Sequence, residues 1–271
     1  MKKFLLAFLT AISVLSTQAQ LVDTVLIPSK AMQKSFKCVV IRPQSPEGKN
    51  TPVPVVYLLH GYSGDYSNWI KKVPELAVYA KLFNLIIVCP DGGYSSWYFD
   101  SPVDPSMRYE TYISEEVPDY IDSHYPTIPD RKGRAISGLS MGGHGGLFLG
   151  FRNADRYGAC GSMSGGVDLS YSRNKYDVMA RLGDTIKYAD NWKKYSVIHM
   201  VENIPTDSIK IIIDCGTEDF FYRNNRALHE KMVKLKIPHD YIERPGAHNW
   251  QYWGNAVKYQ LLFFRNYFDG K

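Results

Sequence analysis

Short runs of consecutive apolar residues recur along the chain, and polar or glycine-containing segments separate them. Two examples are residues 55–59 and 85–89, and residues 210–215 form a further strand-like run with an apolar centre. A strand that is buried on both faces, as in a parallel sheet, is typically such an unbroken apolar run. Apolar residues at helical spacing lie between the runs, so we expect an α/β fold with a mostly parallel central sheet and helices on both faces.

The same pattern gives the order of the elements within one expected domain, residues 20–271. Further strands are predicted at residues 24–27, 36–41, 133–137, 157–162 and 241–243. Helices are predicted at 74–83, 107–124, 142–150 and 227–235 and in the last 20 or so residues, with a kink at Pro118.

A polar stretch at residues 165–206 interrupts this alternation and contains Tyr171, Tyr176, Trp192 and Tyr195. We interpret it as an insertion that lies over the active site, where its aromatic residues could hold an extended substrate. A surface excursion without substrate contact is the alternative.

A serine flanked by glycines follows the strand predicted at 133–137, in the segment Gly138-Leu139-Ser140-Met141-Gly142. Small residues two positions before and after the serine permit a tight strand-to-helix turn that exposes the serine oxygen above the sheet. The Met141 amide and the positive end of the next helix would face the same space and stabilise charge on a substrate oxygen. Ser140 is therefore the predicted nucleophile, and a glycine-rich turn is the alternative.

A second donor for that charge is predicted after the strand at 55–59. The strand ends in His60-Gly61-Tyr62, and a His-Gly pair lets the backbone turn so that the next amide points into the site. The amides of Tyr62 and Met141 would then form the oxyanion hole. His60 itself is expected to be structural.

The base that activates Ser140 is predicted to be His248. It lies in a glycine-containing loop just after a strand, from which a side chain can reach a neighbouring strand end. His229 falls within a predicted helix and His239 enters a strand. In an α/β-hydrolase the order along the chain is serine, acid, histidine, which His248 satisfies.

The acid that orients His248 is expected in the loop after the strand at 210–215. Asp219 lies four residues beyond Cys215, at the correct end of the sheet, and is favoured. Glu218 is the nearest rival, because a shift of one residue redirects the side chain and spacing alone does not separate the two. Asp214 falls within the strand.

Candidate substrate contacts lie in the loop from Asp91 to Tyr98, which follows the strand at 85–89. Its aromatic residues show no helical or strand periodicity, and a loop at the carboxyl end of a strand commonly faces the site. Trp97 and Tyr98 are therefore candidate substrate-binding residues. Packing within the loop is the alternative for both.

Four motifs together resemble those of the esterase D-like esterases. They are His60-Gly61-Tyr62-Ser63-Gly64, Gly138-Leu139-Ser140-Met141-Gly142-Gly143, Cys215-Gly216-Thr217-Glu218-Asp219 and Gly246-Ala247-His248-Asn249-Trp250. The resemblance implies the α/β-hydrolase fold, a triad of Ser140, Asp219 and His248, and an oxyanion hole at Tyr62 and Met141. That family includes feruloyl and acetylxylan esterases, S-formylglutathione hydrolases, siderophore esterases and mycolyl transferases.

The function predicted from these features is that of a secreted serine carboxylic ester hydrolase. A carbohydrate esterase that releases feruloyl or acetyl groups from plant polysaccharide is favoured, with a small-molecule or oligosaccharide ester as substrate. A siderophore esterase or a general short-acyl esterase is the alternative enzyme. From another class, the alternative is an inactive hydrolase-fold protein that only binds.

Composition and charge narrow the choice of partners. The chain has 271 residues and a formal charge of +5, which falls to +3 without Lys2 and Lys3, too weak a charge to indicate nucleic-acid binding. The chain has no C-x-x-C and no H-E-x-x-H, so neither a metal nor a cofactor is expected. The four cysteines lie in or at the ends of predicted strands and are expected to be buried free thiols.

Residues 1–19 are similar to a secretory signal peptide. Two lysines precede an apolar run from Phe4 to Leu15, which is shorter than the roughly 20 residues of a membrane span. Small residues stand at Thr17 and Ala19, three positions and one position before the expected cleavage site. We therefore expect an exported protein, periplasmic or secreted, without a stable membrane anchor.

The leader predicts the N-terminus of the mature protein. Mass spectrometry of the protein from the envelope or medium of its native host should show Gln20 first, allowing for cyclisation of that glutamine. Intact Met1 on the mature protein would contradict this.

Overall fold

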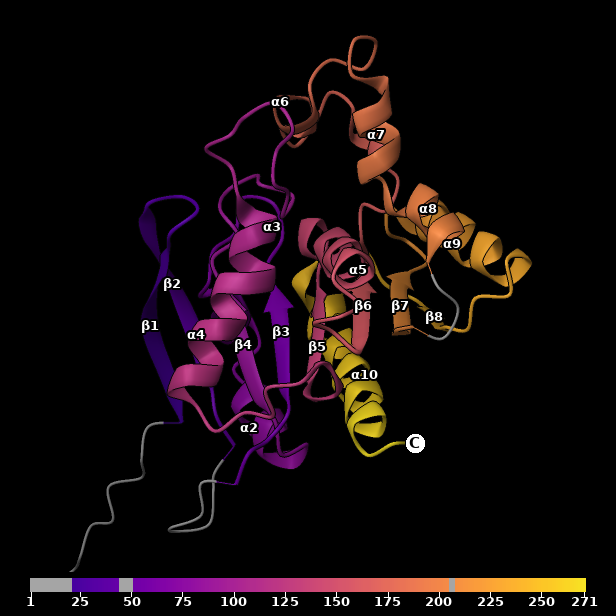
Figure 1. Cartoon of the computed structure of the whole chain (residues 1–271). Coiled ribbons are helices and arrows are strands. Elements are labelled where there is room, and N and C mark those ends of the chain that lie inside the picture. The colour runs from indigo at the N-terminus through magenta and orange to yellow at the C-terminus, as the bar shows by residue number, and fades with distance from the viewer. Residues whose placement is uncertain (1–20, 44–50, 205–207) are drawn as a thin grey trace, which may run out of the picture.

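An eight-stranded sheet forms the centre of the computed structural model, which describes residues 21–43, 51–204 and 208–271 (Figure 1). The predicted leader lies outside these residues. The strand order across the sheet is β1-β2-β4-β3-β5-β6-β7-β8. The strands are β1 (Val22–Ser29), β2 (Lys34–Ile41), β3 (Val55–Leu59), β4 (Ile86–Pro90), β5 (Arg134–Gly138), β6 (Ala159–Met163), β7 (Lys210–Gly216) and β8 (Asp240–Arg244).

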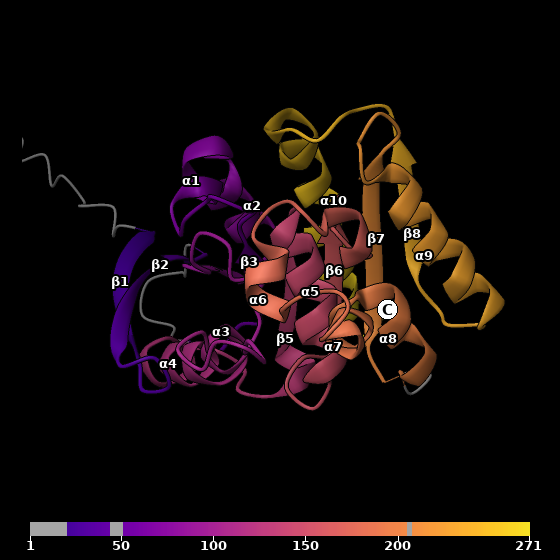
Figure 2. The same cartoon turned by 90° about the horizontal axis from the view of Figure 1, so that it is seen from above.

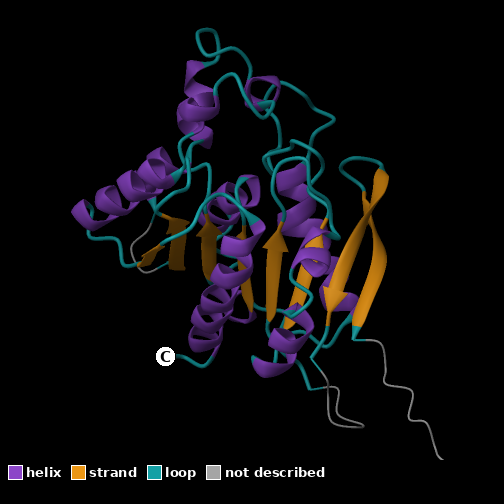
Figure 3. Cartoon of the chain, turned by 180° about the vertical axis from the view of Figure 1, so that it is seen from behind, coloured by secondary structure: helices purple, strands orange, loops and turns teal. Residues whose placement is uncertain are grey.

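The strands from β4 to β8 pair in parallel, as the apolar runs predict. At the other edge, β1 and β2 form an antiparallel hairpin, and β2 pairs antiparallel with β4 (Figure 3). Because β3 to β8 run in one direction, the loops that follow these strands all leave from one edge of the sheet. This edge is the upper one in Figure 1.

Helices cover both faces of the sheet (Figure 2). The alternation along β3 shows why: Val56 and Leu58 pack into one buried cluster with α1, α2 and α10, whereas Val55, Tyr57 and Leu59 pack into the other with α4, α5 and α9. The helices are α1 (Asn68–Lys72), α2 (Leu76–Leu82), α3 (Tyr109–Thr111), α4 (Val117–His124), α5 (Met141–Arg152), α6 (Val178–Leu182), α7 (Ala189–Tyr195), α8 (Val197–Met200), α9 (Tyr222–Lys234) and α10 (Trp250–Phe268).

The helix predicted at 107–124 runs without a break from Tyr109 to His124 and contains a π-helical turn. A π-helical turn at Tyr112–Glu116 separates α3 from α4, and Pro118 is the second residue of α4. Proline has no amide hydrogen to donate to the preceding turn, and a wider turn is one of the ways in which a helix accommodates that loss.

Residues 165–204 lie beyond the carboxyl edge of the sheet, where α6 and α7 stand above the strand ends (Figures 1 and 2). We call this segment the cap. Its contact with the loop of residues 91–108 is extensive, since Arg181 donates to the Ser95 carbonyl at 3.1 Å and Ser101 donates to the Arg181 carbonyl at 2.7 Å.

A buried histidine ties the cap to α5. His144 is fully buried, and its Nε2 lies 2.9 Å from the carbonyl oxygen of Tyr195 at the end of α7. A carbonyl only accepts, so Nε2 carries the proton of a neutral ring. The ring stacks on Phe148 and meets Trp97 and Phe99 edge-on. Burial lowers the pKa of His144 to about 4.

This histidine should make the fold sensitive to acid. The folded pKa lies below the ordinary value of 6.5, so its contribution to stability is complete above pH 6.5 and is lost as the pH falls toward 4. The loss is on the order of 3 kcal/mol. In urea unfolding at pH 7 and pH 4, the free energy of unfolding should fall by about that much more in the wild type than in His144→Gln, whose amide can still donate to Tyr195.

Burial also lowers the pKa values of His60 and His229, but those residues are present in both proteins and cancel in the comparison. Equal pH dependence of the wild type and His144→Gln would contradict the assignment.

Candidate active site

Ser140 stands at the sharp turn between β5 and α5. Its backbone has φ 55° and ψ −115°, a conformation that an L-residue adopts only under constraint. The two neighbouring glycines make the turn possible. A Cβ on Gly138 would lie 2.6 Å from the carbonyl oxygen of Gly142, and one on Gly142 would lie 2.5 Å from that of His60. Larger residues at these positions would push the turn apart.

The structure brings Ser140, His248 and Asp219 into one hydrogen-bonded chain. His248 Nε2 lies 2.9 Å from Ser140 Oγ, and His248 Nδ1 lies 2.8 Å from Asp219 Oδ2 and 3.0 Å from Oδ1. A carboxylate only accepts, so Nδ1 carries the proton and Nε2 is free to accept from the serine hydroxyl. This is the geometry that nucleophilic catalysis by a serine requires.

The two acid candidates occupy different environments. Asp219 is buried, and its Oδ1 also accepts from the Phe221 amide at 2.8 Å, which fixes the carboxylate toward His248. Glu218 is exposed and is not among the hydrogen-bond partners of His248 within the described residues. The geometry therefore favours Asp219, which spacing alone had left open.

The two predicted oxyanion donors border Ser140. Met141 is the first residue of α5, so its amide has no acceptor within the helix. On the other side, a Cβ on Gly61 would lie 3.4 Å from Ser140 Cβ, which brings the Gly61-Tyr62 segment against the nucleophile. In the described structure the Tyr62 amide likewise donates to no backbone carbonyl. Both amides are available to a substrate oxygen.

His60 holds the loop that carries Tyr62. It is buried, its Nδ1 donates to the Gly61 carbonyl at 2.8 Å, and its Nε2 accepts from the Gly92 amide at 2.7 Å. The Tyr98 hydroxyl donates to the His60 carbonyl at 2.9 Å. These bonds connect the loop after β3 to the loop after β4, which agrees with a structural role for His60.

Trp97 and Tyr98 lie beneath the site rather than in it. They are 1% and 0% exposed, so neither ring offers a free face to a substrate. The Trp97 indole donates to the Tyr176 carbonyl at 2.8 Å, and its amide contacts the Met141 sulfur at 3.4 Å. The prediction of direct substrate contact is therefore not supported, and loop packing, the alternative, describes their surroundings.

Other aromatic residues lie near Ser140, and of these Phe220 was not singled out from the sequence. Phe220 is 57% exposed, and its ring centroid lies 4.2 Å from that of His248. On the oxyanion side, the Tyr62 ring contacts those of Tyr94 and Tyr176 at centroid distances of 5.0 and 5.2 Å. The signal for Phe220 was its position directly after Asp219.

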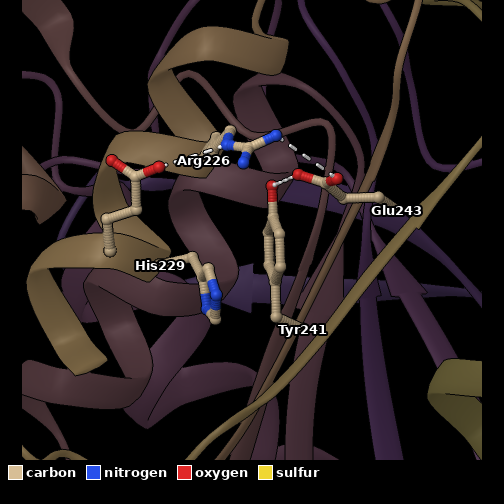
Figure 4. A pocket seen from close by; sticks show the side chains of 5 residues that line it. Arg226, His229, Tyr241 and Glu243 are labelled. Atoms are coloured by element: carbon tan, nitrogen blue, oxygen red, sulfur yellow. Dashed lines mark hydrogen bonds and ion pairs between the residues drawn. The ribbon is translucent and has the colours of Figure 1, made fainter.

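A separate pocket of about 300 Å³ lies between α9 and β8, away from the triad (Figure 4). Its polar groups bond to one another: Arg226 donates to Glu230 at 3.1 Å, Tyr241 donates to Glu243 at 2.9 Å, and the His229 ring stacks on Tyr241 at 4.2 Å. The stack of His229 on Tyr241, together with the hydrogen bond from Tyr222 to Glu243 at 3.1 Å, holds β8 against α9.

The described residues contain neither a candidate metal site nor a membrane-spanning helix. Within residues 21–43, 51–204 and 208–271, no three His, Cys, Asp or Glu side chains are grouped so that they could hold a metal ion. In the same part of the chain, no helix has the length and apolar character needed to cross a bilayer.

The fold and the sequence define the class of protein to which this chain belongs. The chain has the α/β-hydrolase fold and belongs to the family described as "Putative esterase", whose sequence model matches residues 29–264. It is thus a member of a family of carboxylic ester hydrolases, as the four motifs predict.

Individual relatives span most of the chain. The acetyl esterase of Caldicellulosiruptor saccharolyticus is 26% identical over 251 residues, which cover 84% of this chain and 92% of that protein. The S-formylglutathione hydrolase of Mus musculus is 28% identical and covers 74% of this chain and 77% of its own length. A solved structure of a ferulic acid esterase is 29% identical, with a TM-score of 0.77, and covers 91% of this chain and 98% of its own.

Two conservative substitutions separate the acid candidates. Asp219→Asn should lower the kcat of ester hydrolysis by several orders of magnitude, because the amide cannot hold the required histidine tautomer. Glu218→Gln, the matched control one residue away, should stay within about twofold of the wild type. Steady-state kinetics on p-nitrophenyl acetate measures both, and the reverse ranking would move the acid to Glu218.

Proposed function

We propose that this protein is a secreted serine esterase that releases feruloyl or acetyl groups from plant polysaccharide. The observation that carries the catalytic part is the hydrogen-bonded chain from Ser140 through His248 to Asp219, beside the Tyr62 and Met141 amides, which donate to no backbone carbonyl among the described residues. Export rests on the leader, and the substrate class rests on the relatives and on the exposed aromatic residues.

The chemistry follows from the geometry. Ser140 Oγ attacks the ester carbonyl while His248 Nε2 takes its proton, and the carbonyl oxygen becomes an anion that the Tyr62 and Met141 amides stabilise. The ester C–O bond then breaks, and His248 gives the proton to the leaving alcohol. Water, activated by the same histidine, cleaves the acyl enzyme and restores Ser140. Asp219 holds the His248 ring and stabilises its charged form.

Acetyl and ferulic acid esterases among the relatives support a carbohydrate ester as substrate. Phe220 supports it as well, because an aromatic face exposed beside His248 can pack against a feruloyl ring or a sugar. The rings of Tyr62, Tyr94 and Tyr176 offer a second aromatic surface on the oxyanion side. Such contacts, remote from the carbonyl, would raise kcat/KM on the larger substrates.

The test compares kcat/KM on two kinds of ester, in the wild type and in a variant that lacks the Phe220 ring. kcat/KM on a feruloylated or acetylated xylo-oligosaccharide should exceed that on p-nitrophenyl acetate. Phe220→Ala should lower kcat/KM on the oligosaccharide ester about fivefold more than on p-nitrophenyl acetate, which is roughly the 1 kcal/mol of one aromatic contact. Ser140→Ala should abolish both activities without unfolding the protein.

Phe220→Leu is the matched control, since it keeps an apolar side chain without a ring, and it should recover only part of the loss. Equal losses on both substrates would remove Phe220 from the substrate site. Preferential hydrolysis of a ferric siderophore ester would assign the protein to the alternative enzyme class, and a Ser140→Ala protein with normal turnover would refute the mechanism.

A further inference from the structure

The acid and the base of the site leave the sheet from neighbouring strands. β7 and β8 pair in parallel, with Gly216 opposite Arg244 at their carboxyl ends. Asp219 follows β7 by three residues and His248 follows β8 by four. The relative position of the two strand ends therefore sets the relative position of the two side chains.

The two loops also contact each other directly. The Thr217 amide donates to the Arg244 carbonyl at 3.0 Å, and the Glu218 amide donates to the Gly246 carbonyl at 2.9 Å. A Cβ on Gly216 would collide with the Gly246 carbonyl, so the backbones are as close as glycine permits. A tilt of β8 against β7 would therefore move His248 relative to Asp219.

A buried carboxylate, close to where these loops leave the sheet, joins β7, β8 and α10. Asp214, on β7, is fully buried. One of its oxygens accepts from Arg244 Nη2 on β8, and the other accepts from the hydroxyl of Tyr252 on α10. Tyr252 comes only four residues after His248. The Arg244 guanidinium also lies 4.1 Å from the ring centroid of Tyr259, further along α10.

Burying a carboxylate removes its hydration, which is unfavourable unless hydrogen bonds and an opposite charge compensate for the lost hydration. Burial raises the pKa of Asp214 to about 6, and the opposing effects of Tyr252 and Arg244 keep the rise from being larger. A buried ion pair contributes little to net stability compared with apolar packing, but it fixes the geometry of the groups that it joins. Here those groups are the bases of the two catalytic loops.

We propose that Asp214, Arg244 and Tyr252 form a positioning clamp that holds the Asp219 and His248 loops in register for proton transfer. We call these three residues the Asp214 clamp. It acts through the loops and does not touch the substrate, and the inference rests on the proposed roles of Ser140, Asp219 and His248. The three hydrogen bonds of that triad span 2.8 to 3.0 Å, so a small displacement of one loop weakens them.

The clamp is tested by removing one hydroxyl. Tyr252→Phe keeps the ring against Gly216 and Gly246 but leaves one Asp214 oxygen without its donor. kcat on p-nitrophenyl acetate should fall about tenfold or more, as expected for misplaced catalytic groups, with KM unchanged. Asp214→Asn keeps the shape of the side chain and removes its charge, and its kcat should fall as well.

Tyr157→Phe is the matched control for stability. Tyr157 is also buried, and its hydroxyl donates to the Ile113 carbonyl at 3.0 Å on the opposite face of the sheet from α10. Loss of the Tyr157 hydroxyl should lower the melting temperature about as much as Tyr252→Phe lowers it. The kcat of Tyr157→Phe should stay within twofold of the wild type. Rates are normalised to the fraction of folded protein measured by circular dichroism, because labelling of Ser140 by a fluorophosphonate probe depends on the same proton transfer that the clamp is proposed to support.

Three results would overturn the proposal. Normal kcat in folded Tyr252→Phe, or equal losses of kcat in Tyr252→Phe and Tyr157→Phe, would refute the clamp and leave the esterase function intact. A wild-type protein that hydrolyses no ester in the panel would refute the proposed function, and the clamp with it.

Discussion

The strained backbone at Ser140 is the constraint on which the rest of the site depends. A non-glycine residue at φ 55° and ψ −115° costs about 1–3 kcal/mol, and the surrounding structure must supply that energy. It does so through two contacts so close that only glycine fits, at Gly138 and Gly142, which hold β5, α5 and the end of β3 together. The result is a hydroxyl that projects from the sheet edge with an unpaired amide beside it.

Parallel pairing brings the other components to the same edge. Because β3, β5, β7 and β8 run in one direction, the loops that carry Tyr62, Ser140, Asp219 and His248 all emerge where their strands end. Each loop is then fixed by its own buried polar group: His60 beneath Tyr62, and Asp214 beneath Asp219 and His248. These side chains lie in or next to loops, and buried hydrogen bonds at the carboxyl edge of the sheet join those loops.

The positions of the strands along the chain and the members of the hydrogen-bonded chain could be predicted from sequence, because apolar runs mark the strands of a parallel sheet and the residues after them lie at its carboxyl edge. The aromatic residues could not. Trp97 and Tyr98 lie in a loop without periodicity, and both have positive φ, so nothing in the local pattern shows that their rings turn inward. The choice between Glu218 and Asp219 likewise needs burial, which spacing does not give.

The four cysteines have a consequence for how this protein is made. Cys38, Cys89, Cys160 and Cys215 are all buried with free thiols, and burial raises the pKa of each, so the reactive thiolate is suppressed. The native structure therefore owes nothing to oxidation. Folding therefore needs no disulfide-forming enzyme, whether the compartment is reducing or oxidising.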